Sequence, residues 1–127
     1  MFTARHLEQL REEFMKLSHA MLSLEDMADD LTRLLALLWL RSGGGPINVG
    51  ALQMLAEPHG VPLTAAKALD ICDDLWIANV LTWEKGSFTL ASPHLVEWVR
   101  RMDFNKEIDR LKSLVTQRFA TRATYAI

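Results

Sequence analysis

Apolar side chains recur at alternating spacings of three and four through the first forty residues. The ladder consists of Leu7, Leu10, Phe14, Leu17, Met21, Leu24, Ala28, Leu31, Leu35 and Leu38. This alternation is a heptad pattern with leucine at every d position, which is typical of amphipathic helices packed along one side. It predicts long N-terminal helices over residues 1–41.

The heptad pattern alone leaves open whether one helix or two fill this stretch. Ser23 followed by Asp26 resembles a capping box in which Asp replaces the usual Glu. Acidic residues also gather just after Ser23, where they suit the positive end of a helix dipole. We favour two helices, at about 3–22 and 24–41, with a turn near Ser23. The second is apolar on most sides, as expected of a central buried helix.

Polar capping residues divide the next segment into short helices. A glycine-rich connector at 42–46 ends the preceding helix. Asn48 and Thr64 each stand before an amphipathic run and are suitable N-caps. They predict helices at about 49–57 and 65–78.

Two short runs of β-forming residues follow, at 80–83 and 87–90. The Glu-Lys-Gly segment between them predicts a tight turn and therefore a β-hairpin. Asn79, just before the hairpin, can adopt the left-handed conformation that closes a helix. The Ser-Pro pair at 92–93 then predicts the start of a last helical region that reaches about residue 119.

The order of helix, turn, helix and hairpin over residues 46–101 resembles the winged helix-turn-helix superfamily. The resemblance rests on 48–56 and 60–64 for the first two helices. It also rests on positions that match the buried face of the recognition helix and the start of the wing, namely Leu69, Cys72, Leu75, Asn79, Val80 and Leu81.

This resemblance implies a mainly α fold, a winged helix-turn-helix with a short two-stranded β-hairpin as its wing. Long N-terminal and C-terminal helices flank it here. We expect a single domain over 1–127, comprising the heptad-patterned 1–41, the winged-helix core 46–101 and the C-terminal helix and tail 102–127. Proteins of this superfamily read DNA or dock other proteins.

Composition places the chain among globular proteins, because half of its residues are apolar and its net charge is −2. Cys72 is the only cysteine, so a disulfide framework is excluded and a reducing cytoplasm is the expected location. The longest apolar run is far shorter than the roughly 18 residues that a membrane span needs. The N-terminus also lacks the apolar core of a signal peptide.

Charge along the chain argues against DNA binding through the recognition helix. Its expected outward side carries several aspartates and Lys67 as the only basic residue, and the hairpin tip offers only Lys85. Duplex affinity rests on Lys and Arg neutralising phosphates, and segment 42–99 contains no arginine. Residues 100–127, by contrast, carry a net charge of +4.

We therefore expect the recognition helix and wing to bind a protein partner. The expected contact residues combine acidic, apolar and flanking basic side chains: Lys67, Asp70, Ile71, Asp74, Ile77, Trp83 and Lys85. Trp is a frequent anchor in protein interfaces. The alternative for Trp76 and Trp83 is that both pack under the long terminal helices.

The heptad ladder predicts a homodimer as well. The expected interface comprises Leu7, Leu10, Phe14, Leu17, Met21 and Leu24 together with Ile108, Leu111 and Val115 of the last helix. The alternative is an ordinary core stripe within one chain. If the protein binds DNA instead, the phosphate contacts would come from Lys67, Lys85, Arg100 and Arg101.

No pattern of residues in this sequence indicates a catalytic site. The four histidines, His6, His19, His59 and His94, are scattered and lack a close-spaced ligand partner. Cys72 falls on the expected inner face of its helix. We expect no enzyme activity, metal, cofactor or small-molecule substrate. The favoured function is a dimeric, non-enzymatic interaction or assembly subunit, and the alternative is a dimeric DNA-binding transcription regulator.

Overall fold

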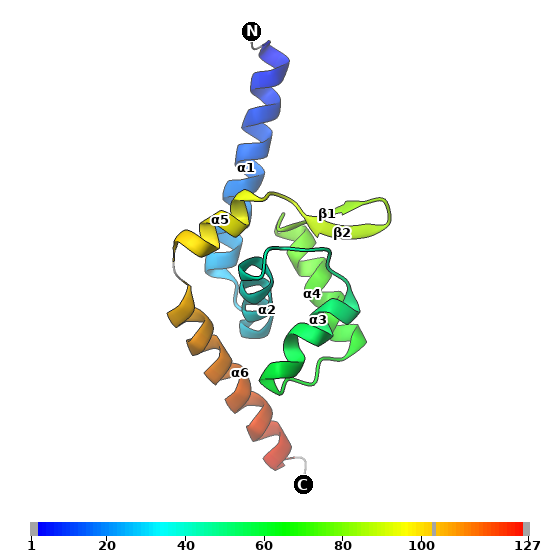
Figure 1. Cartoon of the computed structure of the whole chain (residues 1–127), viewed down its shortest axis with the longest axis vertical. Coiled ribbons are helices and arrows are strands. Elements are labelled where there is room, and N and C mark those ends of the chain that lie inside the picture. Colours follow the sequence, from blue (N-terminus) through cyan, green and yellow to red (C-terminus); the bar gives the residue numbers. More distant parts are fainter. Residues whose placement is uncertain (1–2, 103, 126–127) are drawn as a thin grey trace.

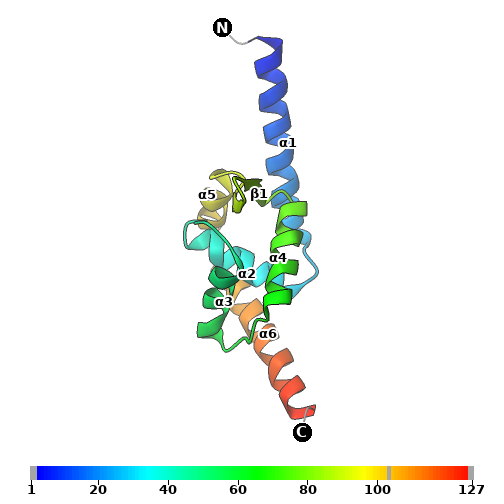
Figure 2. The ribbon, with the colours of Figure 1, turned by 90° about the vertical axis from the view of Figure 1, so that its right-hand side faces the viewer.

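Two long helices leave the body of the molecule at opposite ends (Figure 1). A computed structural model of the protein describes residues 3–102 and 104–125, and side chains as far as residue 118. Helix α1 (Ala4–Asp26) extends from one end and α6 (Asn105–Tyr125) from the other. Figure 2 shows the same arrangement from the side, with the remaining elements gathered between the two helices.

The body contains short helices and one small sheet. Its elements in chain order are α2 (Asp30–Arg41), α3 (Val49–Ala56), a 3₁₀ turn η1 (Glu57–His59), α4 (Ala65–Ile77), β1 (Leu81–Glu84), β2 (Ser87–Leu90) and α5 (His94–Arg101). The described residues are thus mainly helical, as predicted, with a two-stranded antiparallel sheet. None of the helices in the described part of the chain has the length and apolar character to cross a membrane.

The N-terminal ladder forms two helices, as expected, but the break lies later than predicted. Ser23 is inside α1, and α2 starts after the N-cap Asp29. The Asp29 carboxylate accepts hydrogen bonds from the Leu31 N–H at 3.1 Å and the Thr32 hydroxyl at 3.0 Å. Leu24 is fully buried, so continuing the helix past Ser23 keeps that side chain in the core. Asp29 therefore provides the better cap.

Helix α2 is the centre of the core, which confirms the expected buried helix. Most of its side chains are buried, and it contacts α3, α4, α5 and α6. The indole N–H of Trp39 donates to the Gly45 carbonyl at 2.8 Å, which holds the glycine-rich connector against the helix end. One apolar cluster extends from α1 through α2 to α6.

The predicted caps and hairpin are confirmed. The side chains of Asn48 and Thr64 cap α3 and α4, and Asn79 has a φ of 63°. The hairpin turn is tighter than expected, because Glu84 pairs with Ser87 and only two residues remain in the loop. Those two, Lys85 and Gly86, both have positive φ, as a two-residue hairpin turn requires.

The buried face of α4 differs from the expected one. Ala68, Ile71, Cys72 and Leu75 are buried, at spacings of three, one and three, whereas Leu69 is half-exposed. A helix turns by about 100° per residue, so Leu69 lies beside the buried stripe rather than in it. The expectation that Leu69 belongs to the core was wrong, and those for Cys72 and Leu75 were right.

Candidate interaction surfaces

The heptad ladder of α1 divides into a buried part and an exposed part. Leu24 is fully buried, and Leu17 and Met21 pack partly against the core. By contrast, Leu7, Leu10 and Phe14 are 57%, 50% and 68% exposed. We call these three residues the α1 stripe. They lie on the part of α1 that extends beyond the body, where residues 3–16 are all exposed (Figure 1).

Four residues predicted for a dimer interface belong to the core of the chain itself. Leu24, Ile108, Leu111 and Val115 are each at most 2% exposed, and α6 packs directly on α2. A second molecule cannot reach them without unfolding this core. Here the sequence pattern was correct about burial and wrong about the partner, because an apolar stripe looks the same whether it faces the same chain or another.

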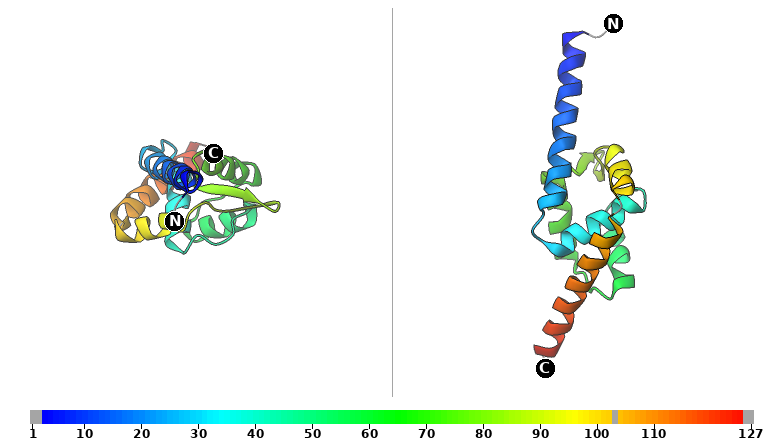
Figure 3. Two further views of the ribbon diagram at one scale, coloured as in Figure 1. Left: turned by 90° about the horizontal axis from the view of Figure 1, so that it is seen from above. Right: turned by 90° about the vertical axis from the view of Figure 1, so that its left-hand side faces the viewer.

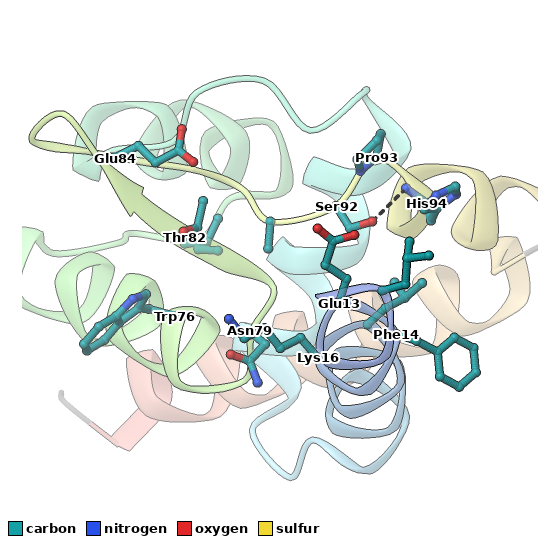
Figure 4. Close-up of a pocket in the computed structure, with 14 residues that line it drawn as sticks. Glu13, Phe14, Lys16, Trp76, Asn79, Thr82, Glu84, Ser92, Pro93 and His94 are labelled. Atoms are coloured by element: carbon teal, nitrogen blue, oxygen red, sulfur yellow. Dashed lines mark hydrogen bonds between the residues drawn. The ribbon is translucent and has the colours of Figure 1, made fainter. Parts of the chain in front are cut away.

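A groove of about 660 Å³ lies beside the α1 stripe. We call it the wing groove. It is bounded by α1, the end of α4, β1 and the segment that leads into α5 (Figure 4). Its lining residues are Leu10, Glu13, Phe14, Lys16, Leu17, Trp76, Asn79, Leu81, Thr82, Glu84, Ala91, Ser92, Pro93 and His94. The α1 stripe thus contributes two of its three members to this groove.

Local contacts hold the walls of the wing groove in place. The Asn79 side-chain amide contacts His19 Nδ1 at 2.9 Å, which joins the end of α4 to α1. The Ser92 hydroxyl accepts a hydrogen bond from the His94 N–H at 3.3 Å, at the start of α5. Viewed from above, the hairpin and α5 lie on different sides of α1 (Figure 3). The first of these contacts joins two walls of the groove, and the second is local to the segment that leads into α5.

The outer side of α4 is acidic and carries exposed apolar side chains. Asp70, Asp73 and Asp74 are exposed, and none of them forms an ion pair with another described residue. Ile77 is also largely exposed. This surface has the composition that the sequence predicted for Asp70, Asp74 and Ile77.

The two tryptophans near this surface remain half-exposed. Trp76 and Trp83 are 51% and 54% exposed, so neither packs beneath a terminal helix. Trp83 meets Phe88 edge-on across the hairpin, with ring centroids 4.7 Å apart. Half-exposed tryptophans of this kind are suited to protein contacts.

Two predicted partner-contact residues are engaged within the chain. Ile71 is fully buried against the core, so the expectation that it faces a partner was wrong. Lys67 Nζ lies 2.8 Å from the Asp29 carboxylate and links α4 to the start of α2. Partial burial acts to raise the pKa of Asp29, but the hydrogen bonds from Lys67 and Thr32 outweigh it and hold that pKa below its ordinary value.

Three arginines of α2 and α6 form ion pairs with acidic residues of the same chain. Arg33 and Arg110 both contact Glu107, and Arg118 contacts Asp30 at 3.1 Å. The hydrogen bond from Arg110 is the main reason that the pKa of Glu107 is lowered. The Arg33–Glu107 and Arg118–Asp30 pairs join α6 to α2, whereas the Arg110–Glu107 pair lies within α6.

Three of the residues expected to contact DNA phosphates in the alternative function are exposed. Lys85 is at the hairpin tip, and Arg100 and Arg101 are in the last turn of α5. Arg101 lies 4.0 Å from Glu97, one turn earlier. The hairpin tip and α5 lie on different sides of α1 (Figure 3), so these residues do not form one continuous basic surface.

Groups that could support catalysis are dispersed or buried. Burial raises the pKa of the Cys72 thiol, and nearby Asp73 raises it further. Burial lowers the pKa of His59, with Lys112 adding to the effect. Within residues 3–102 and 104–118, no group of three His, Cys, Asp or Glu side chains is arranged to hold a metal ion.

Sequence reasoning missed the wing groove and its wall residues Thr82 and His94, and it considered Trp76 only as a residue that binds a partner or packs under a terminal helix. The wall combines α1, α4, the hairpin and α5, and no local spacing links these segments. The only signal was the surplus of large apolar residues, which one small core cannot bury.

Comparison of the chain with protein-family models, with curated proteins and with solved structures finds no match.

Proposed function

We propose that this protein is a non-enzymatic interaction subunit of the winged-helix type, which associates with a second copy of itself through α1. The observation that carries this proposal is the α1 stripe, three large apolar side chains exposed on a helix that extends beyond the body. The acidic outer side of α4 then serves a further protein partner.

The free energy of burial supports self-association. Fully burying one large apolar side chain stabilises by about 1.5–3 kcal/mol relative to leaving it in water. An isolated helix shorter than about 12–15 residues is only marginally stable in water, and residues 3–16 of α1 are all exposed. A partner helix along the α1 stripe would bury these apolar side chains and would also stabilise the first turns of α1.

The order of elements supports the winged-helix part of the proposal. Helices α2, α3 and α4 precede the hairpin, as the three helices of such a domain would. Ile47, between α2 and α3, forms an isolated antiparallel bridge to Phe88 of β2. A short first strand at this place would complete the small sheet of a winged helix.

Charge on α4 favours protein over DNA as the partner of this domain. Its exposed aspartates would meet duplex phosphates as like charges. Lys67, the basic residue nearest to them, is engaged with Asp29. The surface is better matched to a partner that offers basic and apolar side chains.

The experiment is to measure molar mass by light scattering during size-exclusion chromatography for two charge-introducing variants of α1. Phe14→Glu places a charge within the α1 stripe, and we expect it to yield a monomer. Leu22→Glu is the matched control, because Leu22 is 59% exposed on the same helix but outside the ladder. The control should keep the mass of the wild type. Equal masses for all three proteins would refute self-association through α1.

A further inference from the structure

We propose that the open edge of β1 binds an extended segment of a protein partner, which adds to the hairpin as a further antiparallel strand. The segment alternates basic and apolar side chains. This inference rests on the proposed binding of a protein partner beside α4, and it adds the element that is bound and the chemistry of the bound segment. It does not depend on self-association through α1.

Hydrogen bonds of the hairpin show which backbone groups face the open edge. β1 pairs with β2 on one side only, and the bridge to Ile47 lies on the far side of β2. The Ile47 N–H donates to the Phe88 carbonyl at 3.4 Å, so the backbone groups of Phe88 point away from its strand partner Trp83. In an antiparallel pair, opposed residues exchange both hydrogen bonds or none. The N–H and C=O of Trp83 therefore point away from β2.

The same alternation places the backbone groups of Leu81 on this edge, two residues before Trp83. No described residue outside the hairpin forms a backbone hydrogen bond with either of them. Leu81 is buried, whereas Trp83 is 54% exposed and Glu84 is also exposed, so the edge is open toward the hairpin tip. Such an edge is a template on which an extended chain can pair through its backbone.

The wing groove gives this edge a defined surface. Thr82 and Glu84 of β1 line the groove, and Trp83 does not, as expected when side chains alternate between the two faces of a strand. Trp76 also lines the groove, and Figure 4 shows it on the side of β1 that faces away from β2. A strand added to the edge would run beside this half-exposed indole and cover part of it.

The dimensions favour a short extended segment over a folded domain. The four residues of β1 span about 14 Å, so they pair with a segment of about four residues. The groove volume of about 660 Å³ is in the range of about 300–1,000 Å³ that is typical of small-ligand sites. A second copy of the chain would have to bring a whole body to this edge, beside the wall that α1 forms.

Charge predicts basic side chains on the groove face of the segment. Glu13 and Glu84 line the groove, and among its lining residues Lys16 is the one Lys or Arg, with His94 at the far end. Asp73, three residues before Trp76, is exposed and adds a further negative charge nearby. Basic side chains would complement this surface.

The other face of the hairpin calls for apolar side chains at the alternate positions. Trp83 and Phe88 pack edge-on there, with ring centroids 4.7 Å apart. A residue of the segment opposite Trp83 lies on the same face and beside its ring, where cross-strand pairs of aromatic and β-branched residues are favourable. The segment therefore alternates a β-branched residue with Arg or Lys.

The first test titrates the ¹⁵N-labelled protein with the end-blocked peptide Val-Arg-Val-Arg to about 5 mM and follows amide chemical shifts by NMR. In the antiparallel pair, the Val N–H groups point to β1 and the Arg N–H groups point away. N-methylation of both Val nitrogens should raise the dissociation constant at least about tenfold. N-methylation of both Arg nitrogens gives an isomer of equal charge and should change it less than about threefold. Equal binding of the two isomers would overturn strand addition.

The second test changes the protein and keeps the hairpin. Trp83→Pro removes the outward N–H, and proline is tolerated on an edge strand where the N–H faces solvent. Trp83→Ala is the matched control, because it removes the indole as well but keeps the N–H. Val-Arg-Val-Arg should bind Trp83→Pro at least about tenfold more weakly than Trp83→Ala, with circular dichroism showing that both variants fold. Equal affinities would contradict the inference.

The outcomes separate this inference from the proposed function. If the peptide binds but neither the isomers nor the two variants differ, the acidic surface binds a basic partner through side chains and strand addition alone fails. If the peptide does not bind, both strand addition and the proposed partner surface fail, while self-association is decided by Phe14→Glu. Both Trp83 variants should keep the wild-type mass in light scattering. A dimer that Trp83→Pro alone dissociates would place a second copy on this edge and overturn the inference.

Discussion

The Asp29 carboxylate accepts a hydrogen bond from Lys67 Nζ at 2.8 Å, joining the residue that starts α2 to the first turn of α4. The same carboxylate caps α2 through the Leu31 N–H and the Thr32 hydroxyl. One acidic side chain thus sets where the long N-terminal ladder breaks and holds the acidic helix against the core.

Asp29→Ala should therefore destabilise the fold. Loss of an N-cap costs about 0.5–2 kcal/mol, and loss of the partly exposed ion pair adds at most about 1 kcal/mol. Urea unfolding followed by circular dichroism measures the change. Asp73→Ala, on the exposed side of α4, is the control and should stay within about 0.5 kcal/mol of the wild type. A wild-type midpoint for Asp29→Ala would contradict the capping role.

Acid should weaken the fold through Asp29 and Glu107, whose pKa values are both lowered. A carboxyl group whose pKa is lowered in the folded state contributes stability above its unfolded pKa, and this contribution is lost as pH falls through the folded pKa. The free energy of unfolding should thus be level near neutrality and fall below about pH 4. The double variant Asp29→Asn/Glu107→Gln should show a shallower acid fall, and a fall as steep as that of the wild type would count against this assignment.

Leu111 and Leu7 should respond very differently to truncation, although both were expected at a dimer interface. Leu111 is fully buried in the core of its own chain, so Leu111→Ala should cost about 2–5 kcal/mol of folding stability. Leu7→Ala, on the exposed end of α1, should leave the stability of the body nearly unchanged and weaken the dimer instead. Urea unfolding at low protein concentration separates the two effects. Similar losses for both variants would be inconsistent with the structure.

Much of this fold was predictable because local chemistry decides it. Helix caps act within one helical turn, so they can be predicted from a few neighbouring residues. The structure confirms Asn48 and Thr64 as N-caps and the left-handed conformation of Asn79. Ser23, the predicted cap, lies inside α1 instead, because the helix continues through Leu24, and the burial of Leu24 is a tertiary contact that no local pattern encodes.

The functional surfaces were less predictable, for a physical reason. Ile71 was expected to be exposed. Tertiary packing sets the rotation of α4 about its axis, and the sequence pattern does not determine that rotation precisely enough to place Ile71. The wing groove depends on the approach of α1 to the hairpin, which no local pattern encodes. What the sequence did indicate correctly is the excess of apolar residues such as Phe14 and Trp76, which remain exposed in one chain.

Cys72 should be nearly inert in the folded protein. It is buried, and its pKa is raised, so both access and thiolate formation are unfavourable. Its reaction with a thiol reagent at pH 8 should be at least about a hundredfold slower in buffer than in concentrated urea. A fast reaction in buffer would mean that α4 opens readily and would contradict this expectation.

DNA should bind weakly or not at all. In titrations at about 50 mM salt, where electrostatic binding is strongest, we expect no tight complex with duplex DNA. Arg100→Glu/Arg101→Glu should accordingly cause no change. Tight binding that weakens steeply with added salt, and that this double variant abolishes, would instead favour the transcription-regulator alternative.

The central claim is that two chains associate through α1. Sedimentation equilibrium of the wild-type protein over roughly 1–100 μM, a range that covers dissociation constants typical of moderate dimers, tests it most directly. The account predicts an average mass that rises with concentration from the 14.4 kDa of one chain toward twice that value. A mass that stays at 14.4 kDa throughout this range would contradict it.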